Sequence, residues 1–430
     1  MVLMRRRALV SGAASASLLD WAQAWAAQLP FTPESGAQLR LLRPTIAQPG
    51  EGDAMAANIA AFTSATGIPV RIEILPPENI PAKNVRFLQE TAGPDICWAP
   101  NSAAHLIGDR MVDVTDISNY LAGKYGPWYP LSIDYGMQYG RWFNIPVFVT
   151  GSLMNYRISL LHQAGFDTFP KTTDSLLKLC QALQRIGHPA GFAFGHAFTD
   201  ANSFAYWLLW AFGGKVANEQ GRPALESAQT LAALKYAQEL YPTLMTGVQT
   251  WTDISNDAAF LAGQCALTNN PVSIYTQAKS VAPSIAADMD FAPMPIGPIG
   301  VPTALNRVDS LMIFRYEMFS QASKALLTFL MEAPQYPKLI AGSDGYATPT
   351  LRGFADNPVW RSDPKINAFA TAAQDARPVC WPQAANAQAA TVFANFVVVE
   401  MFAAAVSGTV DARSAMHQAQ QRVERLYRYG

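Results

Sequence analysis

The chain has 430 residues, more than one hydrophobic core usually supports, so two lobes are expected. Hydrophobic residues make up 50% and charged residues 15%, a composition that excludes a disordered chain. The formal net charge of -1 excludes the strong basic field with which proteins attract nucleic acid or anionic membranes.

The amino terminus has the organisation of an export signal. Met4 to Arg7 is basic, Ala8 to Leu19 is weakly apolar, and Ala24 to Ala26 offers an A-x-A cleavage site. This pattern predicts a signal peptide over residues 1–26. The consecutive arginines favour the twin-arginine type, and an ordinary Sec signal is the alternative. The apolar run of about 12 residues is too short to span a bilayer.

The four cysteines are spread over the chain, at Cys97, Cys180, Cys265 and Cys380, without the spacing of metal ligands. None precedes Cys97, so the lipid-anchoring cysteine of a surface lipoprotein is missing. A soluble exported protein without a lipid anchor needs an outer membrane to retain it, which favours the periplasm. Buried free thiols are the favoured interpretation, and one disulfide stays open. We expect no metal and no cofactor.

The first part of the mature chain alternates strands and helices. Residues 39–43, 70–74 and 93–98 have strand patterns, and residues 54–66 form an amphipathic helix between the first two. This alternation predicts a parallel sheet with right-handed crossovers. Ligands of such sheets bind beyond the carboxyl ends of the strands. We therefore expect 44–52 and 98–101 at one wall of a cleft.

The segment from Tyr139 to Arg157 is the most informative. It holds a turn, an apolar strand that contains Pro146, a glycine, and a second strand that ends at Tyr156. Proline cannot donate to a strand ladder, so the first strand must be an edge, a sheet boundary or a crossing point. The segment predicts a passage of the chain from one lobe to the other.

Later elements imply that the chain crosses more than once. Expected elements are a helix capped by Thr173, a buried strand at 191–195, a helical stretch at 203–212, a helix capped by Ser227, strands at 264–268, 290–294 and 310–314, a helix capped by Ser320, and mostly helix after 346. The Pro/Gly loop at 295–300 suits a second crossing. The lobes are then discontinuous: 38–147 with 292–345, and 148–291 with 346–430.

Several motifs occur in a fixed order along the chain. They are Phe62 to Val70, Gly93 to Ile96, Ile145-Pro146, Met154 to Tyr156, Ala164-Gly165 before Pro170, Phe212 to Gly214, Ala259 to Leu267, and Pro295 to Pro298. In this order the chain resembles family 1 extracellular solute-binding proteins, the maltose-binding-protein-like class. The resemblance implies an α/β, type II periplasmic binding protein fold, with two lobes joined by a multi-strand hinge that closes on a ligand.

The resemblance also implies a function. The protein would be a monomer that binds a carbohydrate in the cleft between its lobes and docks on the permease subunits of an ATP-driven importer. One alternative is an anionic sugar or polyol derivative, with phosphate or sulfonate held by Arg307 and helix amino termini. A more distant alternative is a secreted glycoside hydrolase, because its carboxylate pair has no fixed spacing. No HExxH, Walker or nucleophile-elbow pattern supports catalysis, so no enzyme is expected.

A carbohydrate site needs flat aromatic surfaces and directional hydrogen-bonding groups, because sugars offer apolar ring faces and many hydroxyls. The ligand-binding candidates are Gln48, Trp98, Asn101, Phe148, Trp210, Asn269, Asn270, Arg307, Asp309 and Tyr346. Each has a structural alternative: core packing for the two tryptophans, helix capping for the asparagine pair, and a mutual salt bridge for Arg307 and Asp309.

Overall fold

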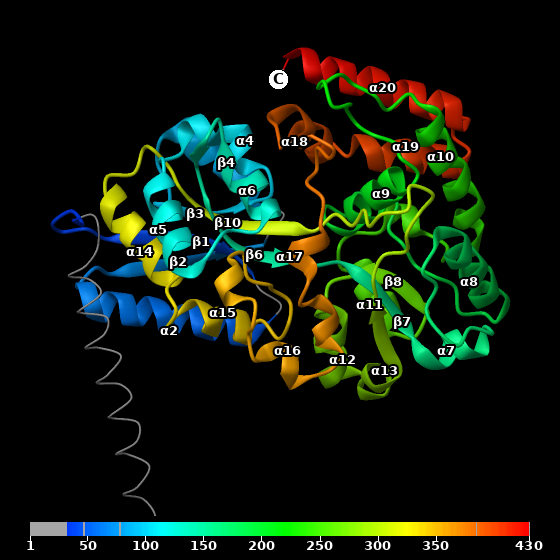
Figure 1. The fold of residues 1–430 in the computed structure, drawn as a ribbon, viewed down its shortest axis with the longest axis horizontal. Helices are drawn as coiled ribbons and strands as arrows, with labels where there is room; N and C mark the ends of the chain where they lie inside the picture. Colours follow the sequence, from blue (N-terminus) through cyan, green and yellow to red (C-terminus); the bar gives the residue numbers. More distant parts are fainter. Residues whose placement is uncertain (1–31, 46–47, 77–78, 384, 430) are drawn as a thin grey trace, which may run out of the picture.

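The computed structural model describes residues 32–45, 48–76, 79–383 and 385–429. The signal peptide predicted over 1–26 lies outside these residues. Two α/β lobes lie side by side, and the chain passes between them through extended segments near the middle of the molecule (Figure 1). The predicted two-lobe fold class is therefore confirmed.

The first lobe is built on a five-stranded sheet of order β2-β1-β3-β10-β6. β1 pairs in parallel with β2 and β3, as the strand–helix alternation predicts, whereas β10 is antiparallel to β3 and β6. The strands are β1 (Leu39–Pro44), β2 (Val70–Leu75), β3 (Ile96–Pro100), β6 (Ile145–Thr150) and β10 (Arg307–Ile313), with a small hairpin of β4 (Met137–Gln138) and β5 (Arg141–Trp142).

Helices cover this sheet on both faces (Figure 1). They are α2 (Pro49–Thr66), α3 (Ile80–Glu90), α4 (Ala103–Ile107), η2 (Gly108–Arg110), α5 (Thr115–Tyr125), α6 (Pro130–Gly136), α14 (Ser320–Leu330) and α15 (Tyr336–Gly342). The predicted apolar face of α2 is buried, with Met55, Ile59 and Phe62 in the core. The helix ends at Gly67, whose φ of 73° is the left-handed cap conformation.

The second lobe has a three-stranded antiparallel sheet in which β7 (Leu153–Arg157) lies between β8 (Leu267–Asn270) and β9 (Met289–Ala292). Its helices are α7 (Ile158–Gln163), α8 (Thr173–Arg185), α9 (Asp200–Ala211), α10 (Ala228–Leu240), η3 (Tyr241–Thr243), η4 (Val248–Thr250), α11 (Ser255–Leu261), α12 (Ser273–Val281), α13 (Pro283–Asp288), α19 (Val397–Ser407) and α20 (Ala412–Tyr429). Short helices join the lobes late in the chain: η5 (Arg352–Phe354), α16 (Val359–Ser362), η6 (Ile366–Phe369), α17 (Ala372–Asp375) and α18 (Ala387–Ala394).

Three local predictions need correction. Residues 191–195 form no strand, because Gly191 N–H bonds to Leu267 and Phe194 N–H bonds to Val248, so no single neighbour supplies a ladder. Thr173 is the first residue of α8, and the cap is Thr172, whose hydroxyl accepts from Ser175 N–H at 3.3 Å.

Ser320 is likewise the first residue of α14 and not its cap, which is Phe319. The predicted cap Ser227 is confirmed, since its hydroxyl accepts from Thr230 N–H at 3.1 Å.

The crossing segments explain the proline. β6 is the edge strand of its sheet, and Pro146 in this strand pairs with Ser310 of β10. An edge strand tolerates a residue without an N–H group, because it has a neighbouring strand on one side only. The chain then passes through Gly151-Ser152 into β7, and it returns between β9 and β10, across the predicted Pro/Gly loop.

A third passage follows later. Thr348 forms a bridge with Val149, and Leu351 forms one with Trp128, so both residues still belong with first-lobe segments. The lobe boundary at 345 stays a prediction of the sequence.

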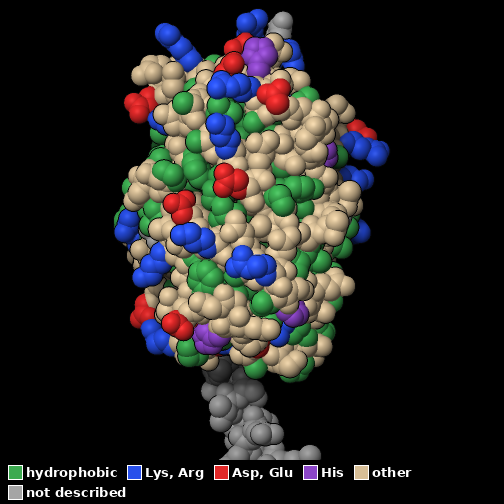
Figure 2. Space-filling view, turned by 90° about the vertical axis from the view of Figure 1, so that its right-hand side faces the viewer, with side chains coloured by type: hydrophobic (Ala, Val, Ile, Leu, Met, Phe, Trp, Pro, Cys, Tyr) green, Lys and Arg blue, Asp and Glu red, His purple; other side chains and the backbone are tan. Residues whose placement is uncertain are grey.

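One continuous hydrophobic core runs through both lobes, and a smaller cluster lies beneath β3. All four cysteines are buried and free. Among the described residues no single helix has both the length and the apolar character to cross a membrane, although the bent pair 387–394 and 397–406 meets these criteria when taken together. On the end face of the second lobe, charged side chains of both signs are scattered among uncharged ones (Figure 2).

Candidate ligand-binding cleft

A cavity of about 600 Å³ lies between the two lobes, a size within the usual range for small-molecule sites. First-lobe residues reach it from the carboxyl ends of β1 and β3, from the start of α2, and from β6 and β10. Second-lobe residues reach it from the amino ends of α9, α11 and α12 and from the end of β8. The expectation that 44–52 and 98–101 form one wall is met by Pro44, Thr45, Gln48, Glu51 and Trp98.

The first-lobe wall holds two arginines, each paired with a carboxylate. Arg43 binds Glu51 at 2.7 Å, and both side chains are buried. Arg307 binds Asp309 at 3.0 Å and also donates to the Tyr346 hydroxyl at 3.0 Å. Burial works to lower the pKa of Arg307, but Asp309 and Tyr346 outweigh it and raise that pKa, so this side chain stays a cation.

Trp98 is tied to the same network, because its indole N–H donates to Asp309 at 3.1 Å. Asp309 thus accepts from two cavity residues, and the salt bridge considered as a structural alternative for Arg307 and Asp309 is present. Arg307 and Asp309 nevertheless both line the cavity. Burial raises the pKa of Glu51 although Arg43 acts against this shift.

Gln48 stands at the start of α2, with 3% of its surface exposed. It lines the cavity, and neither its amide nitrogen nor its amide oxygen has a hydrogen-bond partner among the residues that the structure describes. A buried amide without partners costs free energy, and native proteins usually satisfy such groups. This side chain offers one donor group and one acceptor to a ligand.

The second-lobe wall carries three carboxylates close to helix amino termini. Asp253 accepts from the backbone N–H groups of Thr199 and Asp200 at 2.9 and 3.1 Å, and so caps α9 from outside. Asp257 accepts from the Asn270 side chain. Burial raises the pKa of Asp257 to about 7, and Asp253 adds to the shift. Burial also raises the pKa of Asp200, and the charges of Asp253 and Asp257 add to it.

Aromatic side chains complete the lining. Trp98 and Phe148 belong to the first lobe, Phe198 precedes α9, and Phe396 comes from the segment before α19. His196 stacks on Phe396 with the ring centroids 4.7 Å apart. Flat apolar faces therefore alternate with hydrogen-bonding groups around the cavity.

Seven predicted site residues line this cavity: Gln48, Trp98, Phe148, Asn270, Arg307, Asp309 and Tyr346. That each of them binds ligand remains a prediction. The other three are absent from the lining. Asn101 uses its side-chain oxygen to accept from Val308 N–H at 3.0 Å, which fixes the start of β10. Asn269 donates to the Asp200 carbonyl at 3.4 Å, beneath the wall. Trp210 is fully buried between Tyr206 and Trp381, as its helical spacing from Trp207 would favour.

Sequence reasoning missed the second-lobe carboxylates and two phenylalanines. The sequence did contain a signal for Asp200. Thr199 and Asp200 are residue types typical of a helix start, and α9 begins at Asp200 and not at the predicted residue 203. Asp253 and Asp257 flank the start of α11 in the same way. Phe396 had no signal, since it is brought to the cavity from far along the chain.

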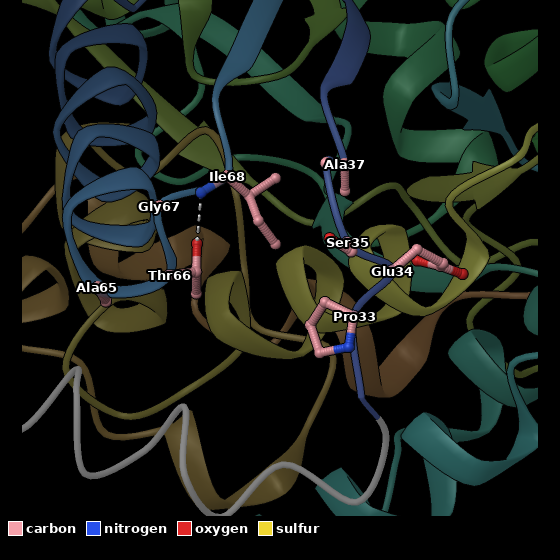
Figure 3. A pocket seen from close by; sticks show the side chains of 9 residues that line it. Pro33, Glu34, Ser35, Ala37, Ala65, Thr66, Gly67 and Ile68 are labelled. Carbon is pink, nitrogen blue, oxygen red and sulfur yellow. Dashed lines mark hydrogen bonds between the residues drawn. The ribbon is translucent and has the colours of Figure 1, made fainter.

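A second, more open hollow of about 420 Å³ lies at the far end of the first lobe, between the segment before β1 and the turn after α2 (Figure 3). Its one charged residue, Glu34, accepts from the N–H groups of Gln321 and Ala322 at 2.9 and 3.0 Å and thus caps α14. Thr66 accepts from Ile68 N–H. These polar groups are engaged in the fold. In the part of the chain that the structure describes, no group of three or more His, Cys, Asp or Glu side chains has an arrangement that could hold a metal ion.

The molecule has two α/β lobes and a cavity lined by residues of both, an architecture that defines the two-lobe class of periplasmic binding folds. The chain belongs to the family described as "Bacterial extracellular solute-binding protein", whose model matches residues 57–368. The expected family relationship is thereby confirmed.

Two relatives are similar to parts of the chain. A protein of Deinococcus radiodurans named "Probable ABC transporter-binding protein" is 22% identical over 249 residues, which are 56% of this chain and 58% of the relative. A protein of Brucella abortus is 21% identical over 196 residues, 45% of this chain and 47% of the relative. The chain thus spans about half the length of these relatives.

Solved structures match the whole fold. "Maltose bound T. maritima MalE3" has a TM-score of 0.78 and 20% identity, and the match covers 91% of this chain and 100% of that one. A sugar transporter from Arthrobacter chlorophenolicus A6 with bound laminaribiose also has a TM-score of 0.78, with 17% identity and coverage of 91% and 99%. At these identities the likeness establishes the fold alone.

Proposed function

We propose that this protein is the substrate-binding component of an ATP-driven importer and binds a carbohydrate between its lobes. The observation that carries the proposal is the interlobe cavity of about 600 Å³, lined by aromatic faces and hydrogen-bonding side chains from both lobes. Ring faces of a sugar would pack on Trp98 and Phe148, and its hydroxyls would bond to Gln48, Asn270 and the carboxylates. The maltose and laminaribiose bound by two structural neighbours support this ligand class.

Delivery would follow from hinge motion. A ligand that contacts both walls favours the closed form, since it gains contacts there that the open form lacks. The closed protein would then dock on permease subunits at the inner membrane and release the ligand. The predicted signal peptide, of the twin-arginine type, supports a periplasmic location, and we propose a monomer without catalytic activity.

An anionic ligand is less well supported. Arg307 already binds Asp309 and Tyr346, and Arg43 already binds Glu51. An anion would have to compete with these carboxylates for both guanidinium groups. It would also meet the carboxylates of the second-lobe wall.

A thermal-shift screen of mono- and oligosaccharides and polyols tests the proposal. We expect at least one carbohydrate to raise the melting temperature, because ligand binds the folded state only. Small-angle scattering should record a smaller radius of gyration with the same ligand. Phe148→Ala should weaken binding, whereas Phe319→Ala, at the far start of α14, should leave the affinity unchanged.

Absence of a response from every carbohydrate would contradict the ligand class. An unchanged scattering curve at saturation would contradict hinge closure. Release of nitrophenol from aryl glycosides would contradict a pure binding role and favour the hydrolase alternative.

A further inference from the structure

The cavity lining is unbalanced in charge. Five carboxylates and two guanidinium groups line it among the described residues. Glu51 and Asp309 are paired with the two arginines of the first-lobe wall. Asp200, Asp253 and Asp257 form the second-lobe wall and have no salt bridge to a basic side chain in the described part of the chain.

Helix capping accounts for only part of this acidity. Asp253 uses one oxygen to accept from Thr199 and Asp200 N–H groups, which is an ordinary stabilising role at a helix amino terminus. Asp200 is the first residue of α9, where the helix dipole also favours a negative charge, and its side chain bonds to Asn256. It is 3% exposed, it lines the cavity, and its Oδ2 has no hydrogen-bond partner among the described residues. Asp257 lines the cavity, and in the described part of the chain the Asn270 amide is the one side-chain group that donates to it. Burial raises the pKa values of Asp200 and Asp257, and no cation among the described residues is close enough to offset this effect. Arg307 is bound to Asp309, and of the groups that act on Asp200 it has the smallest effect on the pKa.

The first-lobe wall supplies an independent observation. The amide of Gln48 is buried, lines the same cavity and has both polar atoms unpartnered. An amide satisfies hydroxyl groups, which both donate and accept. The cavity therefore offers a hydroxyl-binding group and ring-packing aromatics on one side and uncompensated carboxylates on the other.

We propose that the ligand is a carbohydrate that carries a protonated amine, with its ammonium group between Asp200 and Asp257 and its hydroxyls toward Gln48. This inference rests on the proposed function and narrows its ligand class. An ammonium group donates three hydrogen bonds, and each bond to a carboxylate is stronger than one between neutral groups. In a cavity closed from water the charge attraction is stronger still. With a neutral sugar, burial continues to favour the protonated form of these carboxyl groups, whereas an ammonium group favours the ionised form and binds it. An anionic sugar would be repelled by the ionised form.

Matched sugars separate this idea from the proposed function. Isothermal titration calorimetry at pH 7.5 would compare glucosamine and its β-1,4-linked disaccharide with glucose and cellobiose, which replace the amine by hydroxyl. It would also include the N-acetylated forms, which keep the nitrogen and lose the charge. We expect the free amines to bind at least tenfold more tightly than both neutral counterparts.

Variants assign the effect to the carboxylates. Asp257→Asn should reduce the preference for the amine, measured as the ratio of the affinities for the amine and the neutral sugar, at least tenfold. Asp200→Asn provides the same readout if the first variant fails to fold. Asp134→Asn is the matched control, since Asp134 has a pKa raised to about 6 by burial but lies outside the cavity lining. It should keep the full preference.

The outcomes differ for the two proposals. Equal affinity for amine and neutral sugars would overturn the inference and leave carbohydrate binding intact. A preference that survives both Asp variants would overturn the placement of the ammonium group. If putrescine bound and none of the carbohydrates did, both the proposed function and this inference would be overturned. The same would follow if none of the compounds bound.

Discussion

At the scale of single residues, several cavity side chains combine deep burial with polar atoms that lack a hydrogen-bond partner among the described residues. Most polar groups of the described chain have partners, including the buried pairs Arg43–Glu51 and Arg307–Asp309. Gln48 and Asp200 retain free polar atoms although only 3% of each residue is exposed. Such groups destabilise an empty protein and stabilise a filled one, so stability and affinity should respond to their removal in opposite directions.

Gln48→Leu tests this opposition. The substitution removes two unpartnered polar atoms from a buried position, so the free energy of unfolding of the empty protein should rise by about 1 kcal/mol. Affinity for the ligand should fall about tenfold, as a lost hydrogen bond of about 1.4 kcal/mol predicts. Urea unfolding and calorimetry measure the two effects.

The matched control lies on the same helix. Asn58 is buried and donates to the Gln335 carbonyl at 3.2 Å, but it does not line the cavity. Asn58→Leu should lower stability and leave affinity unchanged. If Gln48→Leu behaved in that way too, Gln48 would be a structural residue with no part in binding.

Asp257 gives the empty protein a pH dependence. Its pKa is raised to about 7 in the folded state, mainly by burial, against about 4 in an unfolded chain. A folded-state pKa above the unfolded value gives a stabilising contribution that is complete below pH 4 and is lost as the pH rises through 7. The charges of Asp253 and Asp200 act on this group, and Arg307 acts on Asp200 in the same cavity, so the wild-type pH dependence combines all of them.

The difference between wild type and Asp257→Asn isolates the residue. At pH 8 the variant should be more stable by an amount on the order of 2 kcal/mol, and at pH 4.5 the difference should nearly vanish. Urea unfolding at both pH values measures it. Asp356→Asn, at an exposed residue far from the cavity, should show the same small difference at both pH values. A pH-independent gain in Asp257→Asn would mean that the carboxylate is ionised in the empty cavity.

At the scale of elements, Asn306 connects the crossing segments. Its side-chain oxygen accepts from Ser152 N–H at 3.1 Å, and its nitrogen donates to the Ala372 carbonyl at 2.7 Å. One amide therefore joins three stretches that pass between the lobes. Gly151 belongs to the same contact, because an added Cβ would come within 2.5 Å of the Ala372 side chain.

Asn306→Ala removes both hydrogen bonds at once and leaves a buried N–H and C=O without partners. We expect the free energy of unfolding to fall by about 2–4 kcal/mol, measured by urea unfolding. The scattering curve of the empty protein should also change, since the lobes lose a fixed connection. Asn395→Ala, which removes an exposed bond within one helix turn, should cost less than about 1 kcal/mol and leave the curve unchanged. A loss no larger than this control would exclude Asn306 from the hinge.

Local patterns predicted the elements well, and long-range contacts account for the failures. The strands at 39–43 and 70–74 and the helix at 54–66 were predictable from periodicity, and Pro146 marked the edge strand because its missing N–H is a local property. The second-lobe wall was not predictable in this way. Whether Asp257 or Phe396 faces a cavity depends on which distant segments pack around it, and Trp210 shows that an aromatic residue at helical spacing can belong wholly to the core.

At the scale of the whole molecule, the repeated crossings couple the two lobes. The chain passes from the first sheet to the second between β6 and β7 and returns between β9 and β10. A single hydrophobic cluster includes Leu41 of the first sheet and Leu267 of the second. Unfolding one lobe would expose part of this shared core and release segments that the other lobe needs.

We therefore expect the empty protein to unfold in one cooperative transition despite its two lobes. Urea curves from far-ultraviolet circular dichroism and from tryptophan fluorescence should coincide, because both lobes contain buried tryptophans, among them Trp142 in the first and Trp207 in the second. A saturating ligand at 100 times its dissociation constant should shift the common midpoint by an amount equivalent to about 2.7 kcal/mol without splitting the curve. Trp142→Phe and Trp207→Phe each remove one of the ten tryptophans, one from each lobe, and both variants should give the same midpoint within their own stability changes. Two separated transitions, with only one responding to ligand, would show that the lobes fold independently and that the crossings act as a passive hinge.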